Sequence, residues 1–239
     1  MALIGLNRDE LDLSQLPKDV LYDPKKDDKD DLSGVQIRAT ITFRITNPDG
    51  TVVREWTEPA HSFVENFALF IQALWGATSA VLSDTAGYSV SINGASGGTM
   101  AINAPSGNTD YGIVVGSGAA AGSTPSPFQS NLTAKIPQGT ASGQIEYGAT
   151  SVSTTSVSGQ TSSFTISRSF TNVSGSTINV TEIGIIAYLT GWAMEASSGT
   201  SPVSESSDYF LIAYDIPSSA ITIQNGQTLT ITYTFSVTT

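Results

Sequence analysis

The chain has no cysteine and one histidine, His61, and residues 55–239 contain only two basic side chains, Lys135 and Arg168. Most enzymes that work at neutral pH depend on His, Cys, Lys, Arg or clustered carboxylates. The inventory therefore predicts a protein without enzymatic activity, cofactor or metal site. The absence of cysteine also excludes disulfide bonds.

Charge and long apolar runs are also scarce. Charged residues make up 13% of the chain, about half the usual share, and the net charge is −11. Phosphate backbones and anionic membranes attract clustered Lys and Arg, so we expect neither nucleic acid nor membrane as a partner. No apolar run reaches the ~18 residues that a membrane-spanning helix needs. The first residues, MALIGLNRDELDL, lack the pattern of a secretory signal peptide.

The charge that is present is concentrated in residues 1–34, which hold nine of the 21 acids and five of the ten bases. The second half of this segment, ending in DPKKDDKDDLSG, has too few apolar residues to build a core. Its first half carries spaced apolar anchors: Leu3, Ile4, Leu6, Leu11, Leu13 and Leu16. We therefore expect an extended N-terminal arm that docks on its own domain or on a neighbouring subunit. The aspartates at 27, 28, 30 and 31 lack calcium-loop spacing and indicate a solvated charge run.

A strand hairpin begins the second segment, residues 35–239. From Val35 to Thr46, apolar and polar residues alternate without a break, which is typical of a strand with one buried face. Asn47-Pro48-Asp49-Gly50 supplies turn chemistry, because proline presets the second position and glycine accepts a positive φ. Thr51–Thr57 then returns as the partner strand.

One amphipathic helix is predicted over residues 62–75. Ser62 and Glu65 have capping-box spacing, so each side chain can bond a free backbone N–H at the start of the helix. Apolar residues follow at intervals of three and four and form one broad stripe: Phe63, Val64, Phe67, Phe70, Ile71, Leu74 and Trp75. Gly76 suits the C′ position that ends a helix. Such a stripe favours a helix that covers one end or face of a β domain over a ligand site.

Short strand patterns separated by Gly, Ser, Thr and Pro fill the rest of the chain. The candidates are Tyr88–Ile92, Thr99–Asn103, Tyr111–Val115, Leu132–Ile136, Gly143–Tyr147, Ser162–Thr171, Thr177–Leu189, Tyr209–Asp215 and Leu229–Val237. Many short strands at this spacing predict one mostly β domain over residues 35–239. We expect an antiparallel β-sandwich of jelly-roll or Ig-like type.

Two glycine-rich motifs match known patterns but lack the required context. Gly94–Gly98 reads G-x-S-x-G, the pattern of a hydrolase nucleophile elbow, yet the one histidine precedes it, so a turn between strands explains it better. Gly116–Ala121 fits the dinucleotide fingerprint G-x-G-x-x-A, which requires a helix to open there. Pro125 and Pro127 would stop such a helix early. We assign neither motif a catalytic or cofactor role.

Arg168 and Glu182 are charges that the strand pattern places on a core face. Residues 164–171 and 178–189 flank a turn at Val173–Ser176, and pairing about that turn sets Arg168 opposite Glu182. An inward charge is costly unless a partner satisfies it, so we predict a structural ion pair. After Glu182 the apolar residues change parity, which indicates a β-bulge.

The order of features in residues 35–239 is itself informative. The segment Tyr111–Gly118 leads into a proline-containing loop and Asn131–Ile136, a long strand pair contains Thr181–Ile185, and Phe210–Ile216 precedes Asn225–Leu229 and a threonine-rich last strand. This order resembles structural proteins of tailed bacteriophages, of the tail, fibre or head-decoration type. The resemblance implies a virion component without enzymatic activity.

We therefore predict a non-enzymatic virion structural protein, assembled in the host cytoplasm, that forms a homo-oligomer and contacts other virion proteins through its arm and β domain. One alternative is a secreted, extracellular β-sandwich module that binds carbohydrate or a cell surface, with Trp192 stacking on sugar rings. Another is a surface filament subunit that polymerises by strand or arm exchange. Contact between residues 1–34 and another chain would favour assembly.

Overall fold

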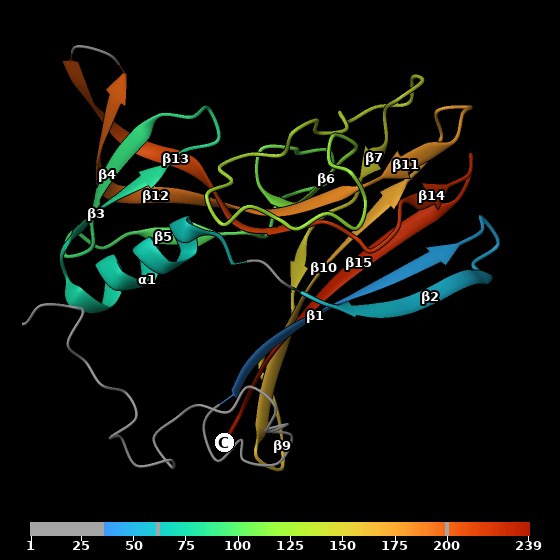
Figure 1. The fold of residues 1–239 in the computed structure, drawn as a ribbon, viewed down its shortest axis with the longest axis horizontal. Helices are drawn as coiled ribbons and strands as arrows, with labels where there is room; N and C mark the ends of the chain where they lie inside the picture. Colours follow the sequence, from blue (N-terminus) through green and yellow to red (C-terminus); the bar gives the residue numbers. More distant parts are fainter. Residues whose placement is uncertain (1–35, 61–62, 199–200) are drawn as a thin grey trace, which may run out of the picture. The chain divides into compact units, whose positions relative to one another are not determined.

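The computed structural model describes residues 36–60, 63–198 and 201–239. They form a mostly β, sandwich-like domain with antiparallel sheets and one helix, which confirms the fold class expected from the sequence (Figure 1). The N-terminal arm, with its anchors at 3, 4, 6, 11, 13 and 16, lies outside the described residues, as do His61 and Ser62.

The first sheet joins the beginning and the end of the domain. Its order is β2-β1-β15-β10-β7, and β8 and β9 also pair with β10. The strands are β1 (Gln36–Thr46), β2 (Val52–Pro59), β7 (Glu146–Tyr147), β8 (Ser151–Val152), β9 (Ser156–Ser158), β10 (Thr161–Thr171) and β15 (Thr228–Thr238). Because β15 pairs along its whole length with both β1 and β10, it is the central strand of this sheet.

The hairpin of β1 and β2 is confirmed. The Gly50 N–H donates to the Asn47 carbonyl at 2.9 Å, and Gly50 has a φ of 82°, which glycine adopts without strain. Asp49 completes the turn by accepting hydrogen bonds from the Thr51 N–H at 2.9 Å and the Thr51 hydroxyl at 2.6 Å. The residues expected to form the turn therefore do so.

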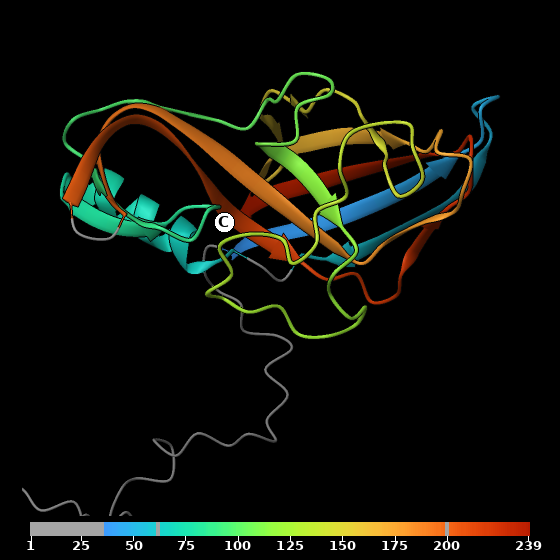
Figure 2. The same cartoon turned by 90° about the horizontal axis from the view of Figure 1, so that it is seen from above.

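The second sheet is built around a long curved hairpin of β12 (Glu182–Ser198) and β13 (Ser201–Asp215), which Figure 2 shows as an arch. The other strands of this sheet are β3 (Ser79–Ser83), β4 (Ser89–Asn93), β5 (Thr99–Ala101) and β6 (Gly112–Gly116). A separate two-stranded sheet consists of β11 (Ile178–Val180) and β14 (Ile221–Ile223).

The hydrophobic core contains alternate residues from both large sheets. Phe43, Phe170 and Ile231 from the first sheet are fully buried, as are Ile183 and Phe210 from the second. The period-two patterns of β1 and β15 thus mark their buried faces, as the alternation predicted.

Helix α1 (Glu65–Gly76) begins later than expected, and its predicted capping box is wrong. The N-cap is Val64, which makes no side-chain capping bond. Glu65 is therefore the first helical residue, whereas the acidic residue of a capping box stands three residues after the N-cap. Backbone carbonyls take over this role, because the Glu65 N–H donates to Pro127 at 2.8 Å and the Val64 N–H to Ile212 at 3.2 Å. The other predicted partner, Ser62, lies outside the described residues.

The far end of α1 also differs from the prediction. Gly76 is the last helical residue, and Ala77, with a φ of 46°, takes the left-handed position. Phe70 and Ala73 are buried, with α1 packed against β3 and β13, whereas Trp75 is 82% exposed. The apolar stripe of α1 therefore serves the core in part and leaves a large apolar side chain in solvent.

The pattern of residues 132–136 predicts a strand, and this prediction is wrong. The segment is a loop with one isolated bridge, between Gly116 and Lys135. Leu132 and Ile136 are buried, which explains the strand-like pattern. The N–H groups of Thr133 and Ala134 bind the Glu182 carboxylate, so they are not free to bond a neighbouring strand.

The predicted hairpin between residues 164–171 and 178–189 is also wrong. β10 pairs with β15, while β11 pairs with β14. After Thr181 the chain leaves the two-stranded sheet and continues as β12 against β6 and β13. The parity change near Glu182 therefore marks a change of sheet. The two register shifts of β12 against β13 lie later, between Ile185 and Ile186 and between Thr190 and Met194.

Candidate functional site

Arg168 lies in the core, and its five guanidinium N–H groups all donate to backbone carbonyls. The acceptors are Gly148 at 2.8 Å, Tyr111 at 3.2 Å, Ile113 at 2.8 Å, Pro105 at 3.3 Å and Asn108 at 2.5 Å. Its guanidinium carbon also lies 4.8 Å from the ring centroid of Tyr147. Burial lowers the pKa of Arg168 to about 10, so the side chain stays charged at neutral pH. Arg168 thus fastens the loop before β6 to β10.

Glu182 is fully buried at the start of β12 and accepts four hydrogen bonds. The N–H groups of Gly118 and Ala134 donate to Oε1 at 2.9 and 2.7 Å, and the Thr133 N–H and Tyr214 hydroxyl donate to Oε2 at 2.9 and 2.8 Å. Burial raises the pKa of Glu182, but the hydrogen bonds outweigh burial and leave the pKa below its ordinary value of 4.5. The carboxylate fastens two loops to the second sheet.

The predicted ion pair between Arg168 and Glu182 is wrong, although both side chains are buried as expected. Within residues 36–60, 63–198 and 201–239, the one ion pair joins Arg44 and Glu55 at the surface, at 3.9 Å. Each buried charge is satisfied mainly by backbone groups, and Glu182 also by the Tyr214 hydroxyl, instead of by a counter-ion. Both residues are structural anchors.

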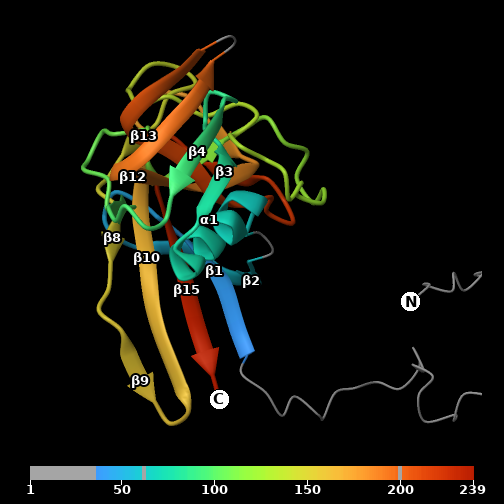
Figure 3. The same cartoon turned by 90° about the vertical axis from the view of Figure 1, so that its left-hand side faces the viewer.

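The core-facing side of the first sheet is longer than the layer of protein that packs on it. At one end this apolar side is therefore exposed to solvent. Along β1, Ile41 is 2% exposed and Ile37 is 72% exposed. Ile37 is opposite Val237 of β15, which is 37% exposed. The core-facing sides of both strands therefore become exposed to solvent at the same end. Figures 1 and 3 show this end of β1, β15 and β10 projecting away from the second sheet.

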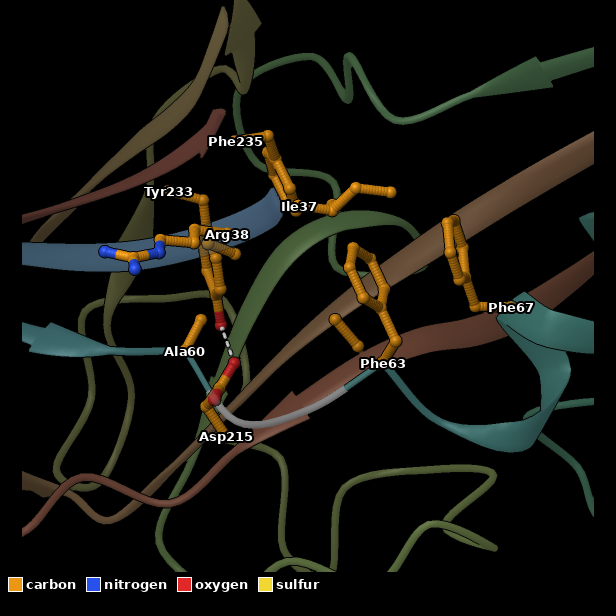
Figure 4. Close-up of a pocket in the computed structure, with 10 residues that line it drawn as sticks. Ile37, Arg38, Ala60, Phe63, Phe67, Asp215, Tyr233 and Phe235 are labelled. Carbon is orange, nitrogen blue, oxygen red and sulfur yellow. Dashed lines mark hydrogen bonds between the residues drawn. The ribbon is translucent and has the colours of Figure 1, made fainter. Parts of the chain in front are cut away.

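Four phenylalanines line the space between this projecting end and α1. Phe164 and Phe235 stack on neighbouring strands with ring centroids 5.1 Å apart. Phe63 lies 5.7 Å from Phe235 and stacks on Phe67 of α1 at 4.0 Å. Figure 4 shows Phe63, Phe67 and Phe235 around the same space. The rings form a continuous apolar lining from sheet to helix.

We call this space the apolar groove. It comprises two adjoining hollows of about 490 and 440 Å³, which share Ile37, Phe63, Phe67 and Phe235. Other apolar side chains that line it are Ile71, Trp75, Met100, Ile102, Phe164 and Val237. An open apolar surface of this kind is suited to bind apolar side chains of another segment.

The polar side chains that line the apolar groove are Arg38, Asp215 and Tyr233 in one hollow and the hydroxyl residues Thr155, Ser162, Ser163 and Ser236 in the other. The Tyr233 hydroxyl donates to Asp215 Oδ2 at 2.8 Å, as the dashed line in Figure 4 shows. Burial and the neighbouring carboxylate raise the pKa of Tyr233 well above its ordinary value. Arg38 also lines the groove and is exposed to solvent. The lining residues therefore offer mainly apolar contacts for binding.

The glycine-rich motifs form a turn and a loop. In residues 94–98, between β4 and β5, the Ser96 hydroxyl donates to the Asn93 carbonyl at 2.7 Å. No helix opens in residues 116–121. A Cβ added at Gly116 would lie 2.5 Å from Glu182 Oε1, so glycine here permits close approach to the buried carboxylate.

Trp192, predicted to stack on sugar rings in the secreted alternative, is buried. Phe70 contacts its ring at 5.5 Å between centroids, and its indole N–H donates to the Thr99 carbonyl at 3.2 Å. Trp192 is therefore a core residue and cannot serve as a sugar platform.

The aspartates at 27, 28, 30 and 31 lie outside the described residues. In the part of the chain that the structure describes, no group of three or more His, Asp or Glu side chains could hold a metal ion. None of the helices described there is long and apolar enough to cross a membrane.

Comparisons with family models, curated proteins and solved structures found no match to this chain. The functional argument therefore rests on the apolar groove, which sequence reasoning did not identify. One signal was present: the alternation of β1 and β15 continues to Ile37 and Val237, beyond the length that the rest of the domain covers.

Proposed function

We propose that this chain is a non-enzymatic virion structural protein, of the tail, fibre or capsid-decoration type. It assembles with copies of itself and with other virion proteins through its N-terminal arm and its β domain. The apolar groove carries this proposal, because exposed Ile37 and Trp75 leave apolar surface in water that a partner would bury favourably.

Removal of residues 1–34 tests the role of the arm. We expect the truncated chain to keep the thermal transition of the full chain, because the described residues between Ile41 and Tyr233 form a hydrophobic core among themselves. We also expect it to remain monomeric at concentrations where the full chain forms a closed homo-oligomer, measured by light scattering during gel filtration. Normal oligomerisation of a folded, truncated chain would contradict the proposal.

A glycan-binding module is the second candidate, because the exposed ring of Trp75 is free to stack on a sugar. A full chain that is monomeric, binds glycans and loses that binding after Trp75→Ala would favour this extracellular function.

A surface filament subunit is the third candidate. Electron microscopy separates it from the leading proposal, since it would produce open filaments in place of closed symmetric particles.

A further inference from the structure

We propose that the apolar groove receives residues 3–16 of the N-terminal arm from a second copy of the chain. This inference rests on the assembly function above and specifies the contact that drives assembly.

The chemistry of the groove matches that segment. The groove presents Phe63, Phe67 and Phe235, with Ile37 and Trp75 exposed beside them. The arm segment carries six aliphatic anchors: Leu3, Ile4, Leu6, Leu11, Leu13 and Leu16. Burial of these anchors against the aromatic lining removes apolar surface from water on both partners.

Spacing along the arm also matches the sheet. In an extended chain Leu11 and Leu13 project from the same side, about 7 Å apart. Ile37 and Ala39 of β1 have the same period and both line the groove. Two apolar side chains of an extended arm therefore have the spacing of two alternate positions on the strand.

The connector between the anchors and the domain is long enough for the arm to reach a second copy. β1 runs from Gln36 into the domain, so the described chain begins at the projecting end of the first sheet (Figures 1 and 3). Residues 17–35 add 19 residues, which reach up to about 65 Å when extended. Ten of them are charged, six acidic and four basic, so the connector itself is unsuited to an apolar groove and can serve as the span that brings the anchors to the groove of a second copy.

Charge at the groove gives the contact an orientation. Arg38 lines the groove and is exposed, and Asp9, Glu10 and Asp12 flank Leu11 in the arm. Attraction between exposed groups of this kind adds little affinity but selects among binding registers.

Single-cysteine cross-linking tests the contact in the full chain, which has no cysteine of its own. Leu13→Cys is mixed with Met100→Cys, which places a thiol in the groove. Because each variant has one thiol, a link between these positions joins two different copies. A matched control mixes Leu13→Cys with Val53→Cys, an exposed position on β2 that is not among the groove residues.

We expect at least about tenfold more cross-linked heterodimer with Met100→Cys than with Val53→Cys, because docking raises the effective concentration of the two thiols. Equal yields would overturn the inference. The double variant Leu13→Cys/Met100→Cys at high dilution supplies the second arm of the test. A link within one chain at a rate independent of concentration would show that the arm occupies its own groove and would also overturn it.

Ile37→Asp provides an independent readout, with Val53→Asp as its control. Ile37→Asp should weaken oligomerisation about tenfold or more, because a charge cannot replace a buried aliphatic contact, and Val53→Asp should not. If Ile37→Asp assembles normally and no selective link forms, this contact is refuted while assembly stands. If the full chain is monomeric at every concentration, the proposed function fails as well.

Discussion

The two buried charged residues and the apolar groove differ in whether the domain itself supplies all the contacts that their side chains need. Arg168 and Glu182 are unusual core residues, yet each has a full set of hydrogen-bond partners within the domain. The apolar groove consists of ordinary apolar residues, yet Ile37 and Trp75 remain exposed. A residue type that is rare in a core does not by itself mark a functional site. Apolar surface that lacks a cover is the better indication of function in this protein.

Replacement of Arg168 should have the largest effect, because it strands several backbone carbonyls in the core. We expect Arg168→Met to lower the free energy of unfolding by about 3–5 kcal/mol, measured by urea denaturation. Arg44→Met is the matched control on the same sheet and should cost less than about 1 kcal/mol, since Arg44 is exposed. Equal losses from the two variants would refute the anchor role of Arg168.

Glu182→Gln should cost about 2–3 kcal/mol at neutral pH, because a neutral amide binds the two N–H groups at Oε1 less strongly than a carboxylate does. The folded-state pKa of Glu182 lies below 4.5, so its stabilisation is present above pH 4.5 and is lost as the pH falls through the folded pKa.

Urea denaturation at pH 7 and at successively lower pH measures this dependence. The wild type and Glu182→Gln should converge in stability at acid pH. Glu55→Gln, an exposed control, should change stability little at any pH. A gap between wild type and Glu182→Gln that stays constant down to pH 3 would contradict the assigned pKa direction.

Changes in the groove should leave the folded domain almost unaffected. Trp75→Ser should change the free energy of unfolding by less than about 0.5 kcal/mol, because the side chain is largely in solvent. The same measurement on Phe70→Ser, from the buried side of α1, should show a loss of about 3 kcal/mol or more. Similar losses would mean that the groove belongs to the core.

The smallest expected effect is the coupling free energy between the side chains of Arg168 and Glu182. Arg168 and Glu182 share no hydrogen-bond partner, so the losses from Arg168→Met and Glu182→Gln should add within about 0.5 kcal/mol. A double-mutant cycle measures this coupling. A coupling well above that value would restore the direct ion pair that the strand pattern predicted.

Local patterns in the sequence determined much of the fold. Alternation from Val35 to Thr46 and the turn at Asn47–Gly50 specified a hairpin, because the side-chain period and the turn chemistry are set by neighbours along the chain. The stripe after Ser62 specified a helix, although not the start of the helix, since backbone carbonyls from distant loops cap it. The same patterns placed Arg168 and Glu182 on a buried face.

Tertiary structure decided which segments meet. The sequence around Thr181 cannot show that β10 pairs with β15, or that the chain changes sheets there, because many strands present compatible edges. It also cannot show that Ile37 and Val237 lie uncovered while Ile41 is buried. Period-two alternation shows which side of a strand is apolar. Only the packing of a second layer decides which part of that side is buried and which part is exposed to water.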